Sequence, residues 1–159
     1  MRAAAIVLAA ACAVVVLALA LPGGGTAGRP APALPARVLR GPAITLASLR
    51  GRPAIVSFFA SWCDPCAREA PQIERAYAAL AGRAGLVAVD WSDNHSSALA
   101  FVRRYKWTLP VLEDSRGVVG EGYGITGLPT TFVLDSQGHI VKRLTGPQTA
   151  AALLAAVHA

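Results

Sequence analysis

The sequence is poor in the residues that hold small proteins together covalently or through metals. Its 159 residues include three cysteines, three histidines and one methionine, and only Cys63 and Cys66 lie outside an apolar N-terminal run. A disulfide framework needs more cysteines than this. A zinc site on the same pair would need two further ligands, and the histidines are not spaced as ligand pairs. A chain of this length can bury a sufficient core without such devices, so we expect one domain with appendages and no bound metal.

Charged residues are also scarce, at 15%, and acidic residues are the scarcer kind. There are 15 Lys and Arg against 9 Asp and Glu, which gives a formal net charge of +6. A basic excess can indicate a nucleic-acid partner, but here the basic residues occur singly or in pairs such as Arg103–Arg104. No basic run is interleaved with aromatic residues. We therefore expect a solvated basic surface and no nucleic-acid partner, with at most a weak attraction to anionic lipid headgroups.

The N-terminus contains the one long apolar run. Ala3 to Leu21 is 19 residues without a charge, close to the ~20 that span a bilayer as a helix and longer than the ~7–15 of a usual signal-peptide core. Residues 1–21 are therefore predicted to be a membrane anchor. The alternative is a signal peptide cleaved at the A-x-A-like site Ala18–Ala20. Either would export the rest of the chain, and Cys12 would carry no chemistry.

The segment after the apolar run has a different composition. Residues 22–37 (PGGGTAGRPAPALPAR) are rich in Gly, Pro and Ala and are predicted to be a flexible linker, because they offer little to bury. The domain itself is expected to comprise residues 38–159.

Within that domain, apolar strand patterns alternate with helical ones. Val38–Leu46, interrupted by Gly41–Pro42, is predicted to form a small hairpin, and the glycine-rich stretch 117–124 a turn or loose helical segment. Strands are expected at 54–60, 86–91, 110–113, 130–134 and 139–145, with helices after Cys63, after Asp93 or Asn94, and at the C-terminus. This alternation indicates an α/β fold with a mixed sheet.

Cys63 and Cys66 form a Cys-x-x-Cys directly after a buried strand pattern, at the start of a helix. A helix N-terminus has unpaired N–H groups and a positive dipole end, which favour a thiolate in its first turn. The first cysteine is expected to be exposed and to attack, and the second to resolve the mixed disulfide. A structural disulfide over so short a loop would stabilise little, so the pattern favours redox chemistry.

The segment from Phe58 to Cys66 (FFASWCDPC) resembles the active site of the thioredoxin superfamily. More narrowly, the chain is similar to the membrane-anchored TlpA/ResA/CcmG-like proteins, which supply reducing equivalents outside the cytoplasm, often for cytochrome c maturation. The resemblance spans roughly 38–157 and includes LRGRP at 49–53, EAP at 69–71 and GLPTTF at 127–132. It implies a thioredoxin-like fold, a mixed central sheet flanked by helices, with an extra strand–helix insert between Cys66 and Pro129.

The resemblance also implies roles for residues around the cysteines. Pro129 matches the family's cis-proline, whose neighbouring backbone pairs with the substrate peptide, and Leu128 would face the sulfurs. Trp62 would form a flat apolar wall for docking substrate, and Pro65 would join it in contacting the substrate.

One position departs from thioredoxin. Thioredoxin has a buried Asp on the strand before the motif, where this chain has Ser57, which cannot manage the proton of the second cysteine. Glu69 lies three residues beyond Cys66, on the same side of the helix, and the reductase subgroup has a Glu there, so we assign it this role. The alternative is an exposed Glu that complements the helix dipole.

The leading function is therefore an enzyme, a reductase of protein disulfides that uses no cofactor beyond the Cys63–Cys66 pair. Its partners would be protein thiols or disulfides, such as apocytochrome c, and an upstream membrane electron donor. The rival is an oxidase that introduces disulfides into exported proteins. A copper chaperone would need a wider cysteine spacing and a distal histidine. A peroxidase would have Thr four residues before Cys63, where this chain has Phe59.

Overall fold

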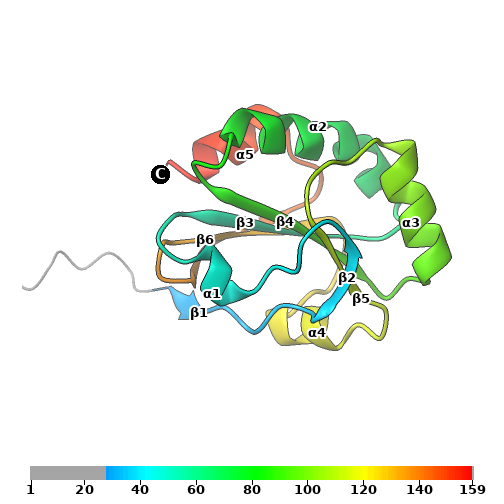
Figure 1. Ribbon diagram of the computed structural model, residues 1–159, viewed down its shortest axis with the longest axis horizontal. Coiled ribbons are helices and arrows are strands. Elements are labelled where there is room, and N and C mark those ends of the chain that lie inside the picture. Colours follow the sequence, from blue (N-terminus) through cyan, green and yellow to red (C-terminus); the bar gives the residue numbers. More distant parts are fainter. Residues whose placement is uncertain (1–27, 159) are drawn as a thin grey trace, which may run out of the picture.

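The computed structural model describes residues 28–158, which form one sheet with helices on both faces (Figure 1). The strands are β1 (Arg29–Pro30), β2 (Arg37–Arg40), β3 (Ala54–Phe59), β4 (Gly85–Trp91), β5 (Val111–Asp114), β6 (Thr130–Leu134) and β7 (His139–Thr145). The helices are α1 (Leu46–Leu49), α2 (Asp64–Leu80), α3 (His95–Arg104), α4 (Val118–Tyr123) and α5 (Ala150–Ala156).

The sheet is mixed, as predicted, and has the strand order β1-β7-β6-β3-β4-β5-β2. The pairs β3–β4 and β4–β5 are parallel, whereas β3–β6, β6–β7, β2–β5 and β1–β7 are antiparallel. Every residue of β3 is buried, which is the environment that its continuous apolar run predicts. In the interval from Cys66 to Pro129, where an insert was expected, α3 and β5 supply the extra helix and strand.

Alternate residues of the central strands supply two cores, one on each face of the sheet. Ile55 and Phe59 of β3 belong to the core under α2, α3 and α5. Val56 and Phe58 belong to the core on the face of α1 and α4. Figure 1 shows α2 and α5 above the sheet and α4 below it. The site therefore rests on a strand whose two faces are both fixed by packing.

The predicted hairpin at 38–46 is wrong. β2 pairs with β5, with Val38 opposite Leu112, and the chain then turns away from the sheet at Gly41, whose φ is +76°. Thr45 next caps α1 through its side chain, which accepts the backbone N–H of Ser48. The sequence pattern correctly indicated an extended segment here, but the strand that it pairs with, β5, lies far along the chain.

The predicted linker is wrong for the part that the structure describes. Arg29 of β1 pairs with Ile140 of β7, the Tyr123 hydroxyl donates to the Pro32 carbonyl at 2.8 Å, and Leu34 packs against the second core. The domain therefore begins before residue 38, because even a Pro- and Ala-rich segment can order when a sheet edge offers hydrogen bonds. The predicted anchor or signal at 1–21 lies outside the described residues. Within residues 28–158, no helix is both long and apolar enough to traverse a bilayer.

The glycine-rich stretch, predicted as a turn or loose helical segment, forms the short helix α4. At Gly120 a Cβ would come within 2.2 Å of the Trp91 indole, so close packing of the helix on β4 requires glycine there.

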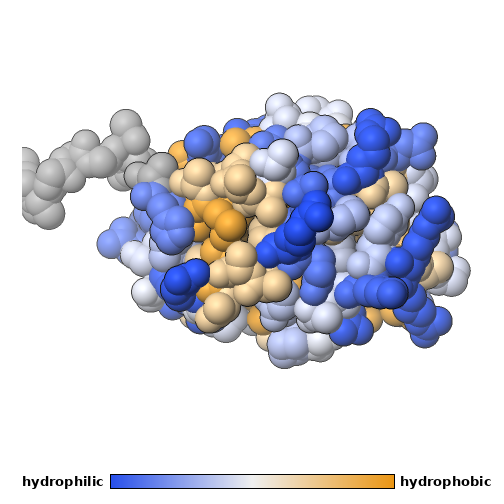
Figure 2. Space-filling view, turned by 90° about the horizontal axis from the view of Figure 1, so that it is seen from above, coloured by the Kyte–Doolittle hydropathy of each residue, from blue (hydrophilic) through white to orange (hydrophobic). Residues whose placement is uncertain are grey.

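Figure 2 views the molecule from the side of α2 and α5. On the face that it shows, an apolar area is surrounded by hydrophilic side chains in several separate places.

Candidate active site

Cys63 and Cys66 lie where the buried strand β3 passes into α2. Cys63 is the N-cap of α2, and its sulfur accepts the backbone N–H of Cys66 at 3.1 Å. The two cysteines form a disulfide with their Cα atoms 5.2 Å apart. The helix N-terminus thus directs a backbone donor at the sulfur of the first cysteine, which is the interaction that stabilises a thiolate once the disulfide is opened.

The first cysteine is more buried than we predicted. Cys63 is 4% exposed and Cys66 2%, and both belong to the core that contains Phe59 and Ala70. The physical reason is the bond to Cys66, which holds the Cys63 sulfur toward the core in the oxidised form. The neighbouring Trp62, in contrast, is 58% exposed.

Two hydrogen bonds hold the turn before Cys63 to the loop after β4. The Ser61 backbone N–H donates to Asp93 Oδ2 at 2.7 Å, and the Trp62 indole N–H donates to the Ser92 carbonyl at 3.2 Å. The indole is therefore fixed at its nitrogen while its ring remains open to solvent. This arrangement presents an apolar surface beside the disulfide.

Glu69 is buried in α2, at 2% exposure. Its Oε1 accepts the backbone N–H of Gln148 at 2.8 Å, from the segment before α5. Burial raises the pKa of Glu69 to about 7, and the Gln148 hydrogen bond opposes part of that rise. The alternative of an exposed, dipole-complementing Glu is excluded, and what remains is a carboxyl group that exchanges a proton near neutral pH. Sequence reasoning missed Gln148, and no local signal marks it.

The loop before β6 carries the other predicted residues. The Leu128–Pro129 peptide bond is cis, Pro129 is buried, and Leu128 and Pro65 are half-buried. Leu128 packs against both cores. A groove of about 220 Å³ lies beside this loop, lined by Thr126, Gly127, Leu128, Pro129, Thr130, Thr145 and Gly146.

A second groove lies on the other side of the turn, between the start of α2 and α3. It measures about 390 Å³, and its lining includes Ser61, Asp64, Phe101 and Arg104. A third groove, of about 460 Å³, lies at the opposite end of the sheet near Leu49 and Gly85, away from the cysteines. Of these grooves, the second is lined by Ser61 of the turn before Cys63 and by Asp64 of the first turn of α2.

Ser57 lies at the position where thioredoxin has an acid. It is buried, and its hydroxyl accepts a hydrogen bond from the Thr131 hydroxyl at 3.1 Å. No carboxylate can act from this point of β3. Buried acids stand instead on α2, at Glu69, and at the ends of β4 and β5.

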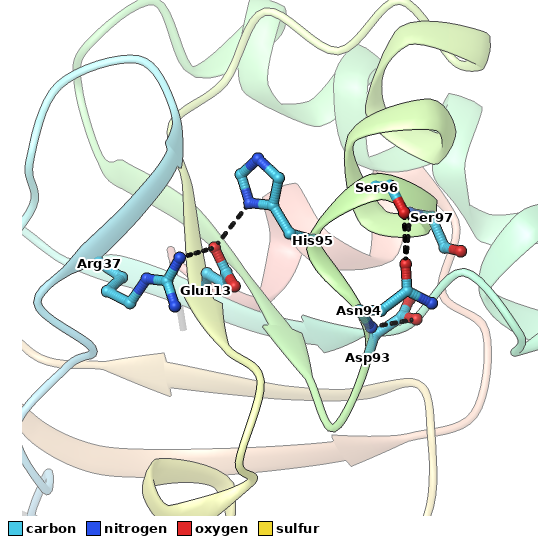
Figure 3. Close-up of polar contacts among 7 residues, drawn as sticks. All are labelled: Arg37, Asp93, Asn94, His95, Ser96, Ser97 and Glu113. Atoms are coloured by element: carbon cyan, nitrogen blue, oxygen red, sulfur yellow. Dashed lines mark hydrogen bonds and ion pairs between the residues drawn. The ribbon is translucent and has the colours of Figure 1, made fainter.

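The acids of β4, of the loop after it and of β5 form a group that sequence reasoning missed as a unit. Asp90, Asp93, Glu113 and Asp114 are all buried. Figure 3 shows Glu113 between His95 and Arg37, whose nitrogens lie 2.9 Å and 3.5 Å from Glu113 Oε2. One signal was available in the sequence: Asp90 follows Leu86 and Ala88 at every second position of an apolar strand, which places its side chain on the same inward face.

Comparison with known proteins gives one family and several close relatives. The sequence profile described as the AhpC/TSA family matches residues 27–143. The sporulation thiol-disulfide oxidoreductase A of Bacillus subtilis is 34% identical over 137 residues, which are 81% of this chain and 82% of that protein. The thiol-disulfide oxidoreductase ResA of Bacillus thuringiensis is 29% identical over 123 residues, 77% of this chain and 71% of that protein.

Solved structures agree with these relatives. The crystal structure of StoA from Bacillus subtilis superposes with a TM-score of 0.69 at 31% identity, over 79% of this chain and 96% of that one. A thiol:disulfide interchange protein of the thioredoxin family from Chlorobium tepidum superposes with a TM-score of 0.72 at 29% identity, over 82% of this chain and 94% of the other. The matched region begins at residue 27, which supports the corrected start of the domain.

Proposed function

Because the chain belongs to the AhpC/TSA family of thioredoxin-like proteins and is a thiol–disulfide oxidoreductase, we propose that it reduces protein disulfides outside the cytoplasm. The observation that carries the proposal is the pairing of a Cys63–Cys66 disulfide at the start of α2 with the buried acid Glu69 one turn further on. This pair can pass two electrons, and the acid can handle a proton that the second cysteine must lose and regain.

The forward reaction begins with the reduced protein. The Cys63 thiolate attacks one sulfur of a substrate disulfide, a mixed disulfide forms, and the departing substrate thiolate takes a proton from water. The Cys66 thiol then gives its proton to Glu69 and attacks the Cys63 sulfur. The second substrate thiolate leaves and is protonated, the Cys63–Cys66 disulfide forms, and two electrons have passed to the substrate.

The remaining residues would bind and orient the substrate. Trp62 offers an exposed ring, and the backbone beside cis-Pro129 lies in a groove that a peptide can enter. Leu128, in the cis-Pro129 loop, and Pro65, between the two cysteines, are half-buried, so each retains surface for contact. Docking on backbone and apolar surface would tolerate many substrate sequences.

The direction of electron flow follows from the charges near Cys63. Asp64 places a carboxylate beside the sulfur, and Pro65 has no N–H to donate. No Lys, Arg or His stands between the cysteines, although Arg68 offsets part of the acidic charge. A less stabilised thiolate makes the disulfide comparatively stable and the pair reducing.

Redox equilibration against glutathione or dithiothreitol tests this direction. We expect a potential near the thioredoxin end of the range, about −270 mV, rather than near the strong-oxidant end of about −120 mV. A potential above roughly −180 mV would overturn the reductase assignment and make the protein an oxidase of exported thiols.

We further propose that the protein works at the membrane surface, tethered through residues 1–21, with apocytochrome c as one substrate class and an upstream membrane electron donor. The uncharged run of 19 residues supports the tether. Membranes washed with carbonate should retain the full-length protein. Recovery of a soluble exported form that begins at Leu21 would contradict the tether.

A further inference from the structure

Asp90 is the most anomalous polar residue in the described part of the chain. It is 0% exposed, and neither of its carboxylate oxygens has a hydrogen-bond partner. An isolated buried carboxylate is costly, and such a group takes up a proton instead. The fold therefore contains a carboxyl group whose ionisation costs free energy, beneath the loop that holds the Cys63 turn.

The surroundings of Asp90 are acidic. In register it lies opposite Phe59 of β3 and Glu113 of β5, and it shares the inward face of β4 with Ala88. Three acids act on Asp90: Asp93 in the loop after β4, and Glu113 and Asp114 in β5. Two basic groups contact one of these acids, Glu113: His95 at the start of α3 and Arg37 in β2. From β3 the neighbour is the uncharged Phe59, and beyond it Cys63 titrates only when reduced.

The two basic groups, His95 and Arg37, pair with Glu113 and not with Asp90. Figure 3 shows His95 and Arg37 converging on Glu113 from α3 and β2. Asp114 is likewise satisfied, because its Oδ2 accepts the Gly120 N–H at 2.8 Å. Asp93 accepts two backbone N–H groups, from Ser61 at 2.7 Å and from Asn94 at 2.8 Å. Asp90 is thus left with a carboxylate neighbour and no donor.

A single proton resolves this arrangement. A neutral Asp90 carries an O–H that it can donate to Asp93, and Asp93 then remains the charged acceptor of the Ser61 N–H. Burial, and next the charges of Asp93 and Glu113, raise the pKa of Asp90 to about 8, and the hydrogen bond that a protonated Asp90 can donate to Asp93 adds to the rise. We propose that Asp90 and Asp93 hold one proton between them beneath the Ser61–Trp62 turn, and that Asp90 is thereby a positioning residue for Cys63.

Loss of that proton to solvent leaves two buried carboxylates in contact. Asp93, at 9% exposure, is nearer the surface than Asp90 at 0%, so repulsion displaces Asp93 and weakens its bond to the Ser61 N–H. The turn that carries Cys63 is then held less firmly. In terms of the proposed function, on which this consequence rests, attack by Cys63 becomes slower above the pH at which the proton leaves.

Nuclear magnetic resonance tests the structural part without any assay of activity. In the wild-type protein labelled with ¹³C at Asp side chains and ¹⁵N at amides, the Asp90 carboxyl carbon and the Ser61 amide should titrate together, with a midpoint near pH 8. In Asp90→Asn the Ser61 amide should keep its low-pH position throughout. In Asp93→Asn the midpoint of Asp90 should move to lower pH, because a charge and a hydrogen-bond acceptor are lost.

Asp114→Asn is the control, because it removes another buried Asp, whose partner is Gly120. It should retain the Ser61 titration, with a midpoint somewhat lower because the charge of Asp114 is lost. The rate of disulfide exchange should fall several-fold across the same pH range in the wild type and in Asp114→Asn, and not in Asp90→Asn. An Asp90 carbon that titrates near the ordinary range of an Asp, or a Ser61 step that persists in Asp90→Asn, would overturn the proposal. Since the wild-type spectra alone give the first of these results, the test stands even where a variant fails to fold. A flat rate profile with the resonance steps intact would contradict the proposed function only.

Discussion

Glu69 and Asp90 are both buried acids, but the residues around them differ. Glu69 has a backbone donor, Gln148, whereas Asp90 has none. The pKa of Glu69 is accordingly about 7 and that of Asp90 about 8, burial being the largest cause in each case. At neutral pH Glu69 is poised to take or give a proton, while Asp90 keeps its own.

The Glu69→Gln variant isolates the proton transfer from Cys66. A base must be deprotonated to act, so in the wild type resolution of the mixed disulfide should accelerate as the pH rises through about 7. The variant should lose that pH dependence and resolve about 100-fold more slowly, at the lower end of what general base catalysis supplies. Rapid-mixing measurements of substrate release check this. Glu74→Gln, at a half-buried position of the same helix where the carboxylate accepts the Thr108 N–H, should leave the rate unchanged, and an equal effect of both changes would remove Glu69 from the mechanism.

The roles of the two cysteines can be separated by trapping. Cys66→Ala should accumulate a mixed disulfide between Cys63 and the substrate, because the resolving thiol is missing. Cys63→Ala should accumulate none. Non-reducing gels followed by mass spectrometry of the linked peptides provide the measurement, and a complex formed through Cys66 would reverse the assignment.

Sequence reasoning worked at this scale where the chemistry was local. Cys63 and Cys66 were identified from the buried strand before them and the helix after them, and the departure at Ser57 from the resemblance to thioredoxin. The burial of Cys63 and the donor on Glu69 depend on segments far along the chain, such as Gln148, which local spacing does not encode. The strand pattern places Asp90 on an inward position, but the sequence does not show which groups surround it there, and its role depends on them.

At the scale of elements, the central strands were predicted well and the edges poorly. The continuous apolar run of β3 and the helix after it have strong local signals. β1 and β2 are short edge strands whose partners lie far along the chain: Arg29 of β1 pairs with Ile140 of β7, and Val38 of β2 pairs with Leu112 of β5. Their order comes from hydrogen bonds offered by those partners, so composition alone indicated a linker and a hairpin.

Removal of residues 28–37 tests the contribution of this edge. A chain that begins at Val38 loses the β1–β7 pairing, the contact of Leu34 with the core and the acceptor of the buried Tyr123 hydroxyl. An unsatisfied hydroxyl and one lost apolar contact together cost on the order of 3 kcal/mol. Denaturant unfolding should show this loss against a chain that begins at Ala27. Equal stabilities would mean that the segment is the passive linker its composition suggests.

At the scale of the whole molecule, the sheet gathers the reacting groups at one end. β3 and β4 are parallel, so the turn with Cys63 and the loop with Asp93 follow their carboxyl ends and meet there. α2 carries Glu69 back over the sheet, and the cis-Pro129 loop enters at the start of β6, which runs antiparallel to β3. The fold thus places two titrating acids on the same face of the sheet as the redox pair, and both must affect the stability of the protein.

The pH dependence of that stability can be worked out from the two groups. Each has a higher pKa in the folded protein than in the unfolded chain, from 3.8 to about 8 for Asp90 and from 4.5 to about 7 for Glu69. Between these values the folded state holds protons that the unfolded chain has released, so the free energy of unfolding falls as the pH rises. The fall is roughly 1.4 kcal/mol per pH unit for each group, from about pH 4 until each folded-state pKa is passed.

Asp90→Asn should remove one of these two contributions. Its amide can still donate to Asp93, but it has no proton to lose, so the variant should gain stability over the wild type progressively from about pH 4 to about pH 8. Glu69→Gln should do the same only up to about pH 7. Thermal unfolding of the three oxidised proteins at several pH values measures this. If the stabilities of the wild type and the variants run parallel across the pH range, the two acids are ionised in the folded protein. Otherwise, the pH at which each variant stops gaining stability over the wild type shows which acid keeps its proton to higher pH.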